Sequence, residues 1–219
     1  MSFRNREEAA RLLADQLVSY RGRNPLVLAI PRGAVPMASV IAESLDGEMD
    51  VVLVHKLSAP GQPELAIGSI DERGQVYVSE LAVSLGVGDE YIAREKRAQM
   101  KILSGRRARY TPVHPPIDPV GRVVIVVDDG IATGATMISA LRAVRIQKPS
   151  RLIAATAVAS REALQMIRGL AEEVVCLEVP DVFYAVGQFF LEFPQVSDEE
   201  VIMFLKRSRS KAGNVNHLT

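Results

Sequence analysis

Two adjacent carboxylates, Asp128 and Asp129, are followed within a few positions by a run of small and hydroxyl-bearing residues. This run, A-T-G-A-T at 132–136, would let an anion approach the backbone closely. Backbone N–H groups and threonine hydroxyls donate to a phosphate, and the start of a following helix favours negative charge. Carboxylates suit sugar hydroxyls or a hydrated divalent cation. The segment therefore predicts a ligand with neighbouring hydroxyls and a phosphate, such as ribose 5-phosphate.

A strand and a helix must hold these residues in place. Residues 123–127 read V-V-I-V-V, which is typical of a strand buried on both faces, and residues 134–146 have the pattern of a helix. The carboxylates would then lie at the C-terminal end of the strand, where open α/β sheets bind ligands. A plain strand-to-helix turn, with the aspartates acting only as caps, is the alternative interpretation.

Strands and helices alternate along the chain, which predicts an α/β fold: a parallel, twisted sheet with helices on both faces. We expect one domain over residues 1–219. The expected strands are 26–30, 51–54, 123–127, 152–158 and 173–177, and the expected helices are 7–20, 35–45, 89–104, 134–146, 161–170 and one opening at 197–200.

Three segments lack a regular period. Residues 57–75 contain several glycines and are expected to form a long flexible loop, with a short hairpin near 75–79. Residues 178–196, rich in aromatic side chains and proline, are expected to form a small lobe, and the polar tail 206–219 is expected to be mobile.

Composition narrows the classes of function. The 26 basic and 26 acidic side chains balance, which argues against a nucleic-acid partner. A lone cysteine, Cys176, excludes an intrachain disulfide and thiolate metal clusters. No stretch is apolar for long enough to cross a membrane, and the first residues lack a signal core, so we expect a cytoplasmic protein.

The segment V-V-I-V-V-D-D-G-I-A-T-G-A-T resembles the signature with which type I phosphoribosyltransferases bind 5-phosphoribosyl-1-pyrophosphate (PRPP). The resemblance implies that Asp128 and Asp129 hold the ribose 2- and 3-hydroxyls and contact Mg²⁺ through water. It also implies a cradle for the 5-phosphate, formed by Ala132, Thr133, Gly134, Ala135 and Thr136.

The same resemblance assigns a second loop. Pro31-Arg32-Gly33 ends an expected strand, and by position it is the pyrophosphate loop, with Arg32 and Gly33 as donors to the diphosphate. A plain strand-to-helix turn is the alternative. A cis peptide bond between Pro31 and Arg32 is implied as well. Lys56 follows the second expected strand and is assigned to the diphosphate, although a solvated surface charge is an equal alternative.

Catalytic and acceptor residues are expected outside these loops. The segment 57–75 resembles, by position, the loop that closes over the reaction, and Glu64 is its best candidate for a catalytic acid; a surface glutamate is the alternative. Residues 178–196 occupy the place of the family's hood, where Phe183 or Tyr184 would stack on an acceptor base unless both belong to the core.

Two departures separate this chain from hypoxanthine-type enzymes. Ala132 stands where those enzymes carry an aspartate, and strand 152–158 contains no lysine to bind a purine carbonyl. The overall layout most resembles a bacterial group of phosphoribosyltransferase-like proteins whose acceptor is not settled. We expect a Mg²⁺-dependent phosphoribosyltransferase acting on a base, as a possible homodimer. A regulator that senses PRPP or a nucleotide, and a sugar-phosphate hydrolase or phosphorylase, are the alternatives.

Overall fold

The structure, a computed structural model, describes the backbone of residues 2–215 and their side chains except those of residues 63, 64 and 210–215. A five-stranded, all-parallel sheet forms its centre, which confirms the predicted fold class. Its strands, in spatial order, are β2 (Glu48–Val51), β1 (Leu26–Ala29), β6 (Val123–Asp128), β7 (Arg151–Val158) and β8 (Glu173–Glu178).

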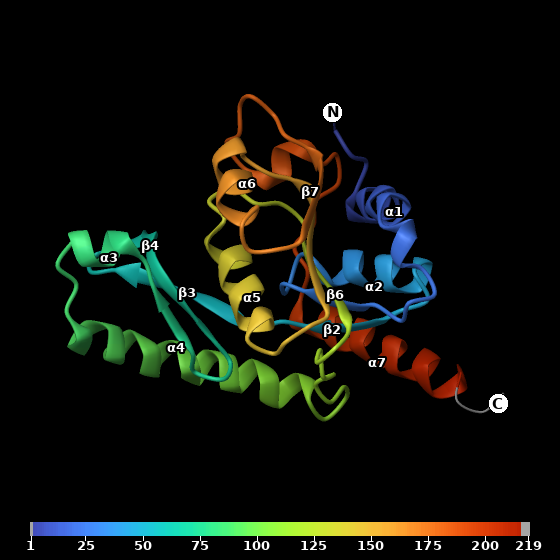
Figure 1. Cartoon of the computed structure of the whole chain (residues 1–219), viewed down its shortest axis with the longest axis horizontal. Coiled ribbons are helices and arrows are strands. Elements are labelled where there is room, and N and C mark those ends of the chain that lie inside the picture. Colours follow the sequence, from blue (N-terminus) through green and yellow to red (C-terminus); the bar gives the residue numbers. More distant parts are fainter. Residues whose placement is uncertain (1, 216–219) are drawn as a thin grey trace.

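Helices cover both faces of this sheet, as predicted (Figure 1). On β6, the side chains of Ile125 and Val127 pack with the cluster that contains α1 (Arg6–Gln16) and α2 (Val35–Ser44). Those of Val124 and Val126 pack on the other side, with α5 (Ala135–Arg145) and α6 (Arg161–Ile167). Because successive side chains of a strand point to opposite faces, burial on both faces requires the continuous apolar run seen at 123–127.

The last helix, α7 (Asp198–Val215), packs against α2 and β2. Its start confirms the capping pattern expected at 197–200: the Ser197 hydroxyl accepts from the Glu200 backbone N–H, and the Glu200 carboxylate accepts from the Ser197 N–H. The helix continues through residues that the sequence analysis assigned to a polar tail from 206 onward. Residues 216–219 of that tail lie outside the described chain.

The expectation of a long loop at 57–75 was wrong. These residues belong to an antiparallel sheet of β3 (Val54–Ala59), β4 (Gln62–Asp71) and β5 (Val76–Val78). Gly61 and Gly74 lie at the two turns between these strands, with φ of +70° and +80°. These two glycines, which had suggested a loop, are therefore turn residues of two hairpins. The second strand of the chain also lies earlier than expected: it was expected at 51–54, whereas β2 ends at Val51.

Helices α3 (Glu80–Ser84) and α4 (Asp89–Tyr110) join this second sheet to form an arm, residues 54–110, that extends away from the central sheet (Figure 1). Leu57, Ile67 and Leu103 are fully buried within the arm, and α5 packs against β3 and β4. Helix α3 was not predicted, and α4 is longer than the expected 89–104. Short 3-10 turns at Val18–Tyr20 and Val186–Phe189 complete the described chain. Within that chain, no helix has both the length and the apolar character needed to cross a membrane.

Candidate functional site

Two loops that are a hundred positions apart in the sequence meet at the C-terminal edge of the central sheet. Strands β1 and β6 are neighbours, with Ala29 opposite Val127, and the Ile30 N–H donates to the Val127 carbonyl at 2.9 Å. The loop at 31–33 therefore leaves the sheet beside the loop at 128–136. The peptide bond between Pro31 and Arg32 is cis, as expected.

The two carboxylates at the end of β6 are both half-buried. Burial, together with the neighbouring charge of Asp129, raises the pKa of Asp128 well above its usual value. Burial also raises the pKa of Asp129, and the Arg6 guanidinium opposes that rise. The Asp128 carboxylate accepts from the Asp129 backbone N–H at 2.9 Å. Two neighbouring carboxylates with reduced access to water favour a ligand that brings hydroxyl donors or positive charge to them.

Arg6, at the start of α1, is a site residue that the sequence analysis missed. Its Nε and Nη2 atoms both lie 2.9 Å from Oδ2 of Asp129. Nη1 donates to the Pro194 carbonyl at 2.7 Å, and the guanidinium carbon lies 3.7 Å from the centre of the Phe193 ring. No local pattern around residue 6 indicates this role, because its ion-pair partner lies 123 positions further along the chain.

Gly33 brings the second loop into contact with the acidic pair. A Cβ atom at this position would lie 2.1 Å from Oδ2 of Asp129, so only glycine fits beside the carboxylate. The neighbouring side chain of Arg32 is 42% exposed and lies 3.9 Å from Oδ1 of Asp198, at the start of α7. Among the described side chains, Asp198 is the one ion-pair partner of this partly exposed guanidinium, which is therefore available to an anionic ligand.

The loop at 132–136 is attached to the end of β7 and is partly exposed to solvent. Gly134 has φ of +80° and precedes the first residue of α5. The Ser160 hydroxyl donates to the Ala132 carbonyl at 2.7 Å, which ties the loop to the end of β7. Ala132 and Thr133 are exposed, whereas Ala135 and Thr136 are half-buried at the helix start. The first backbone N–H groups of α5 have no partner within the helix, which makes them available to an anion.

The structure places the side chains of three of the four other predicted site residues. Lys56 is half-buried on β3, opposite Ser69 of β4, rather than in a loop after β2. The side chain of Glu64 lies outside the described residues. Phe183 packs against Phe189, with ring centres 5.3 Å apart, whereas Tyr184 is 87% exposed. Phe183 thus has core-like contacts, and Tyr184 is the aromatic side chain of the hood that a ligand can reach.

The two carboxylates at the end of β6 offer oxygen donors of the kind that Mg²⁺ binds. Within the described part of the chain, no group of three or more histidine, cysteine, aspartate or glutamate side chains could by itself enclose a metal. Asp128 and Asp129 offer oxygen donors only, which Mg²⁺ prefers, and this ion commonly keeps several waters and takes further ligands from substrate phosphates. The pair therefore fits a hydrated Mg²⁺ that arrives with its ligand.

Comparison with known proteins gives consistent results. Residues 3–194 match the family described as "Phosphoribosyl transferase domain". A Mycobacterium tuberculosis protein with the provisional name of a phosphoribosyl transferase is 39% identical over 208 residues. The match covers 94% of this chain and 47% of that protein, so the chain spans about half the length of this curated relative.

Two further similarities extend the comparison. A protein of known crystal structure from Thermus thermophilus is 43% identical, with a TM-score of 0.85, and the match covers 94% of this chain and 99% of that one. A ribose-phosphate pyrophosphokinase from Methanopyrus kandleri is 32% identical over 194 residues, which is 85% of this chain and 60% of the archaeal protein.

Proposed function

Because the chain belongs to the phosphoribosyl transferase domain family, we propose that it binds Mg-PRPP and transfers the phosphoribosyl group to a nitrogenous base, with release of pyrophosphate. One observation carries the proposal. The half-buried pair Asp128 and Asp129 lies between a loop that opens a helix at Gly134 and a second loop that brings Gly33 against Asp129. This arrangement offers acceptors for sugar hydroxyls and donors for a 5-phosphate and a diphosphate.

Each part of PRPP is assigned to one part of the site. In the proposal, backbone N–H groups and hydroxyls of residues 132–136 bind the 5-phosphate, and Asp128 and Asp129 accept hydrogen bonds from the ribose hydroxyls. Arg32, the Gly33 backbone and Lys56 bind the diphosphate. The name of the Methanopyrus kandleri relative gives ribose phosphate as that protein's substrate, which supports a ribose phosphate ligand for the related chain.

Asp128 and Asp129 would hold Mg²⁺ through water in this proposal. The bound cation would supply neutralising charge for the departing diphosphate. The carboxyl groups contribute oxygen acceptors in fixed positions, and Arg32 contributes a positive charge on the diphosphate side.

The proposed reaction needs positioning more than covalent chemistry from the protein. A bond forms between the acceptor nitrogen and the anomeric carbon, while the bond from that carbon to a diphosphate oxygen breaks. The bonding electrons leave with the diphosphate. The proton of the acceptor nitrogen passes to the carboxylate of Glu64, which in the reverse direction would be the acid that protonates the leaving base. Positive charge develops on the ribose ring in between, and the nearby carboxylates stabilise it.

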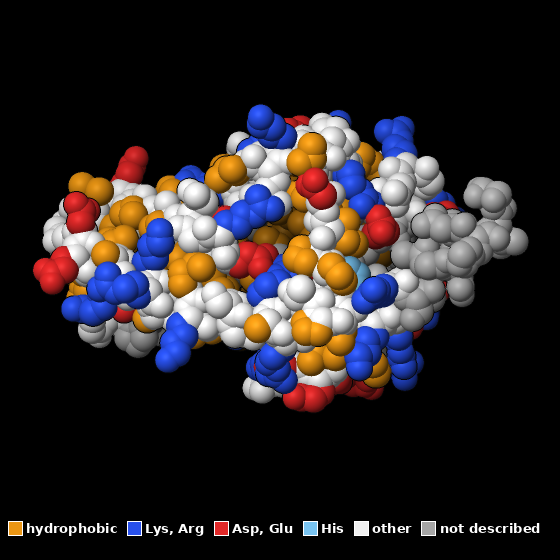
Figure 2. Space-filling view, turned by 90° about the horizontal axis from the view of Figure 1, so that it is seen from below, with side chains coloured by type: hydrophobic (Ala, Val, Ile, Leu, Met, Phe, Trp, Pro, Cys, Tyr) orange, Lys and Arg blue, Asp and Glu red, His pale blue; other side chains and the backbone are white. Residues whose placement is uncertain are grey.

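The acceptor would bind under the hood, residues 178–196. Tyr184 is the proposed stacking residue because it is exposed, whereas Phe183 already packs on Phe189. A homodimer and a role in nucleotide salvage are further parts of the proposal. Figure 2 shows basic side chains interspersed with acidic and hydrophobic ones on the face that carries α4, which supports a small-molecule ligand over nucleic acid.

Pyrophosphate release tests the proposal directly. The protein is incubated with PRPP and Mg²⁺ and, in turn, each of a panel of purine and pyrimidine bases. Release that depends on one base would identify the acceptor, and Asp129→Asn is expected to lower that activity by about tenfold or more. Absence of PRPP binding in calorimetry would overturn the proposal.

One observation favours a second candidate, a regulator that senses PRPP or a nucleotide. Ala132 brings no carboxylate to the loop, and its carbonyl is used to bind Ser160. A protein that binds PRPP but needs no proton transfer at this position would have the same loop. PRPP binding without pyrophosphate release, for every base tested, would favour the regulator over the enzyme.

A further inference from the structure

The guanidinium of Arg6 is committed to three partners at once. It bonds Asp129 through two nitrogens, donates to the Pro194 carbonyl through the third, and stacks on the Phe193 ring. The side chain of Arg6 is only 10% exposed and that of Asp129 only 14%, so water competes weakly for these contacts. A fixed guanidinium of this kind holds its partner carboxylate in one orientation.

Backbone pairing fixes the position from which Arg6 reaches the site. The Phe3 N–H donates to the Phe189 carbonyl at 2.8 Å, and the Leu191 N–H donates to the Phe3 carbonyl at 2.9 Å. The Glu192 N–H donates to the Arg4 carbonyl at 2.9 Å. Residues 3 and 4 are thereby attached to the hood, and Arg6 follows immediately as the first residue of α1.

We propose that Arg6 is a positioning residue of the ribose site: it holds the Asp129 carboxylate in the orientation that accepts ribose hydroxyls, and it links this carboxylate to the hood. The inference rests on the proposed function and adds to it a residue from a different part of the chain. Arg6 is placed behind the carboxylate rather than against the sugar, because each of its three guanidinium nitrogens already has a protein partner.

The surroundings of Asp129 explain why it needs such a partner. Its Oδ2 atom lies against the backbone of Gly33 on one side, and Arg6 is the basic side chain that contacts it within the described residues. A buried carboxylate that loses its only cation tends to rotate toward other donors or to draw water into the site. Either change moves the acceptor oxygens away from the positions that the ribose hydroxyls require.

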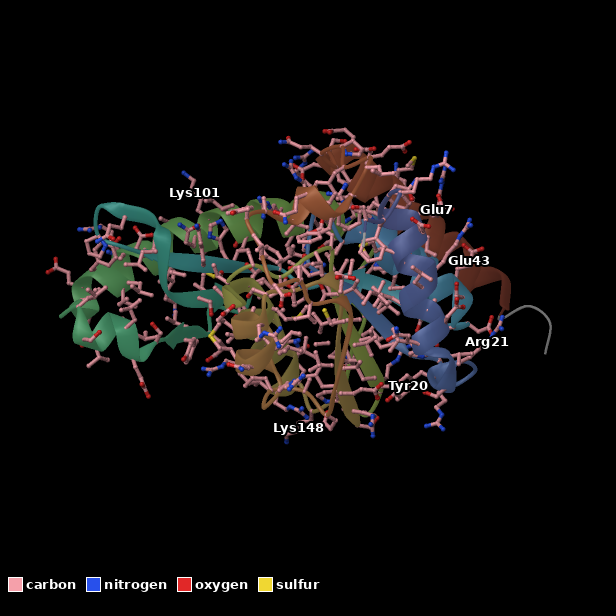
Figure 3. All side chains as sticks on the ribbon, turned by 90° about the horizontal axis from the view of Figure 1, so that it is seen from above. Glu7, Tyr20, Arg21, Glu43, Lys101 and Lys148 are labelled. Atoms are coloured by element: carbon pink, nitrogen blue, oxygen red, sulfur yellow. The ribbon has the colours of Figure 1, made fainter. Side chains whose placement is uncertain are left out.

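Arg11 provides a matched control on the same helix. Its side chain is 70% exposed and pairs with Glu7 at 2.5 Å. Figure 3 shows Glu7 at the outer edge of α1, away from the central sheet. Arg11→Gln therefore removes the same chemical group as Arg6→Gln without reaching the site.

The experiment measures the affinity for PRPP with Mg²⁺ by calorimetry in the wild type, Arg6→Gln, Arg6→Lys and Arg11→Gln. Arg6→Gln is expected to weaken binding by about tenfold or more, and Arg11→Gln to leave it unchanged. Arg6→Lys keeps the charge but cannot bind Asp129 and Pro194 together, so its affinity is expected between the two. Such partial rescue is not expected from a residue that only stabilises the fold.

A double-mutant cycle with Asp129→Asn identifies the route of the effect. Since Arg6 acts through Asp129, the double variant should bind PRPP no more weakly than Asp129→Asn alone. Wild-type affinity in Arg6→Gln, or losses that simply multiply in the double variant, would overturn the inference while leaving the proposed function intact. If Arg6→Gln does not fold, the same cycle is run with Arg6→Lys. A wild-type protein that does not bind PRPP would overturn both.

Discussion

The Asp129 carboxylate is confined on two sides, by the Arg6 guanidinium and by the backbone of Gly33. Confinement of this kind fixes the direction in which the remaining lone pairs of a carboxylate point, and hence which donors a ligand must supply. The site requires a residue without a side chain at position 33, because a Cβ there would occupy the space of Oδ2 of Asp129.

Gly33→Ala tests this packing. The added Cβ would lie 2.1 Å from Oδ2 and 2.9 Å from Cγ of Asp129, so the carboxylate must move. We expect PRPP affinity to fall by about tenfold or more, measured by calorimetry. Gly105→Ala, in α4, is the control, since nothing lies within 4 Å of its added Cβ. Equal affinity in Gly33→Ala and the wild type would contradict the proposed role of this contact.

In the arm, tertiary contacts determine whether a segment forms a strand or a loop. Residues 57–75 contain glycines without a regular period, and this pattern predicted a loop. In the structure Gly68 lies where β4 passes the Tyr77 carbonyl of β5, and a Cβ there would be 2.2 Å from that oxygen. A glycine inside a strand can thus mark a close approach of two backbones rather than the end of an element.

Gly68→Ala should therefore disturb the pairing of β4 with β5. Relief of the clash requires backbone movement, for which a loss of about 1–3 kcal/mol in the free energy of unfolding is expected. Urea denaturation measures the loss, and hydrogen exchange should show reduced protection of the β5 amides. Gly105→Ala is again a suitable control, since a helix interior prefers alanine. Unchanged stability and protection would mean that the two strands are not tightly paired.

The turn between β4 and β5 predicts a pH dependence. Asp71 accepts from the backbone N–H groups of Arg73 and Gln75, and burial raises the pKa of its carboxyl above the usual value despite these bonds. The folded chain therefore keeps this proton to a higher pH than the unfolded chain does. As the pH rises from about 4, the unfolded chain loses the proton first, and stability falls until the raised folded pKa is passed.

Asp71→Asn removes this titration while keeping an oxygen that can accept both N–H groups. The variant's free energy of unfolding, relative to the wild type, should therefore increase with pH above about 4. Urea denaturation at several pH values measures the difference. Asp118→Asn is the matched control, because Asp118 also accepts a backbone N–H, from Val120, but is exposed. A pH-dependent gain no larger than that of the control would refute the prediction.

At the scale of the whole molecule, one arginine joins the arm to the central sheet. Arg107, near the end of α4, donates to the Glu72 carboxylate at 2.6 Å and to the Val51 carbonyl at 3.3 Å. Its Nη1 atom lies 3.8 Å from Oδ1 of Asp50 on β2. Asp50 is almost completely buried. The guanidinium thus contacts the turn that follows β4 in the arm and the edge strand of the central sheet.

Arg107→Met is expected to destabilise the protein strongly. The substitution keeps much of the apolar stem but leaves Asp50 and Glu72 without their cation, and breaking a buried ion pair in this way costs about 3–5 kcal/mol. Urea denaturation is the measurement. Arg21→Gln removes an arginine from an exposed pair with Asp46 and should cost below about 1 kcal/mol. Similar losses in the two variants would show that the arm is held by its apolar contacts alone.

Much of the fold could be predicted because its signals are local. The apolar runs at 26–30, 123–127 and 152–158 match strands of the parallel sheet closely, and the helices at 35–45 and 134–146 match α2 and α5 within one residue at each end. For α4 the prediction stopped at 104, next to Gly105, a residue that disfavours helices; the helix continues because Leu103 and Tyr110 on the same face are fully buried.

By itself, the sequence determined the residue types of the 128–136 segment and the presence of a strand before it and a helix after it, because residue type and short-range period are encoded locally. Only the tertiary structure decided that Arg6 binds Asp129, that Gly33 lies against the same carboxylate, and that 57–75 forms strands. These contacts join positions far apart in the chain, and such partners are selected by packing in three dimensions, which no local pattern records.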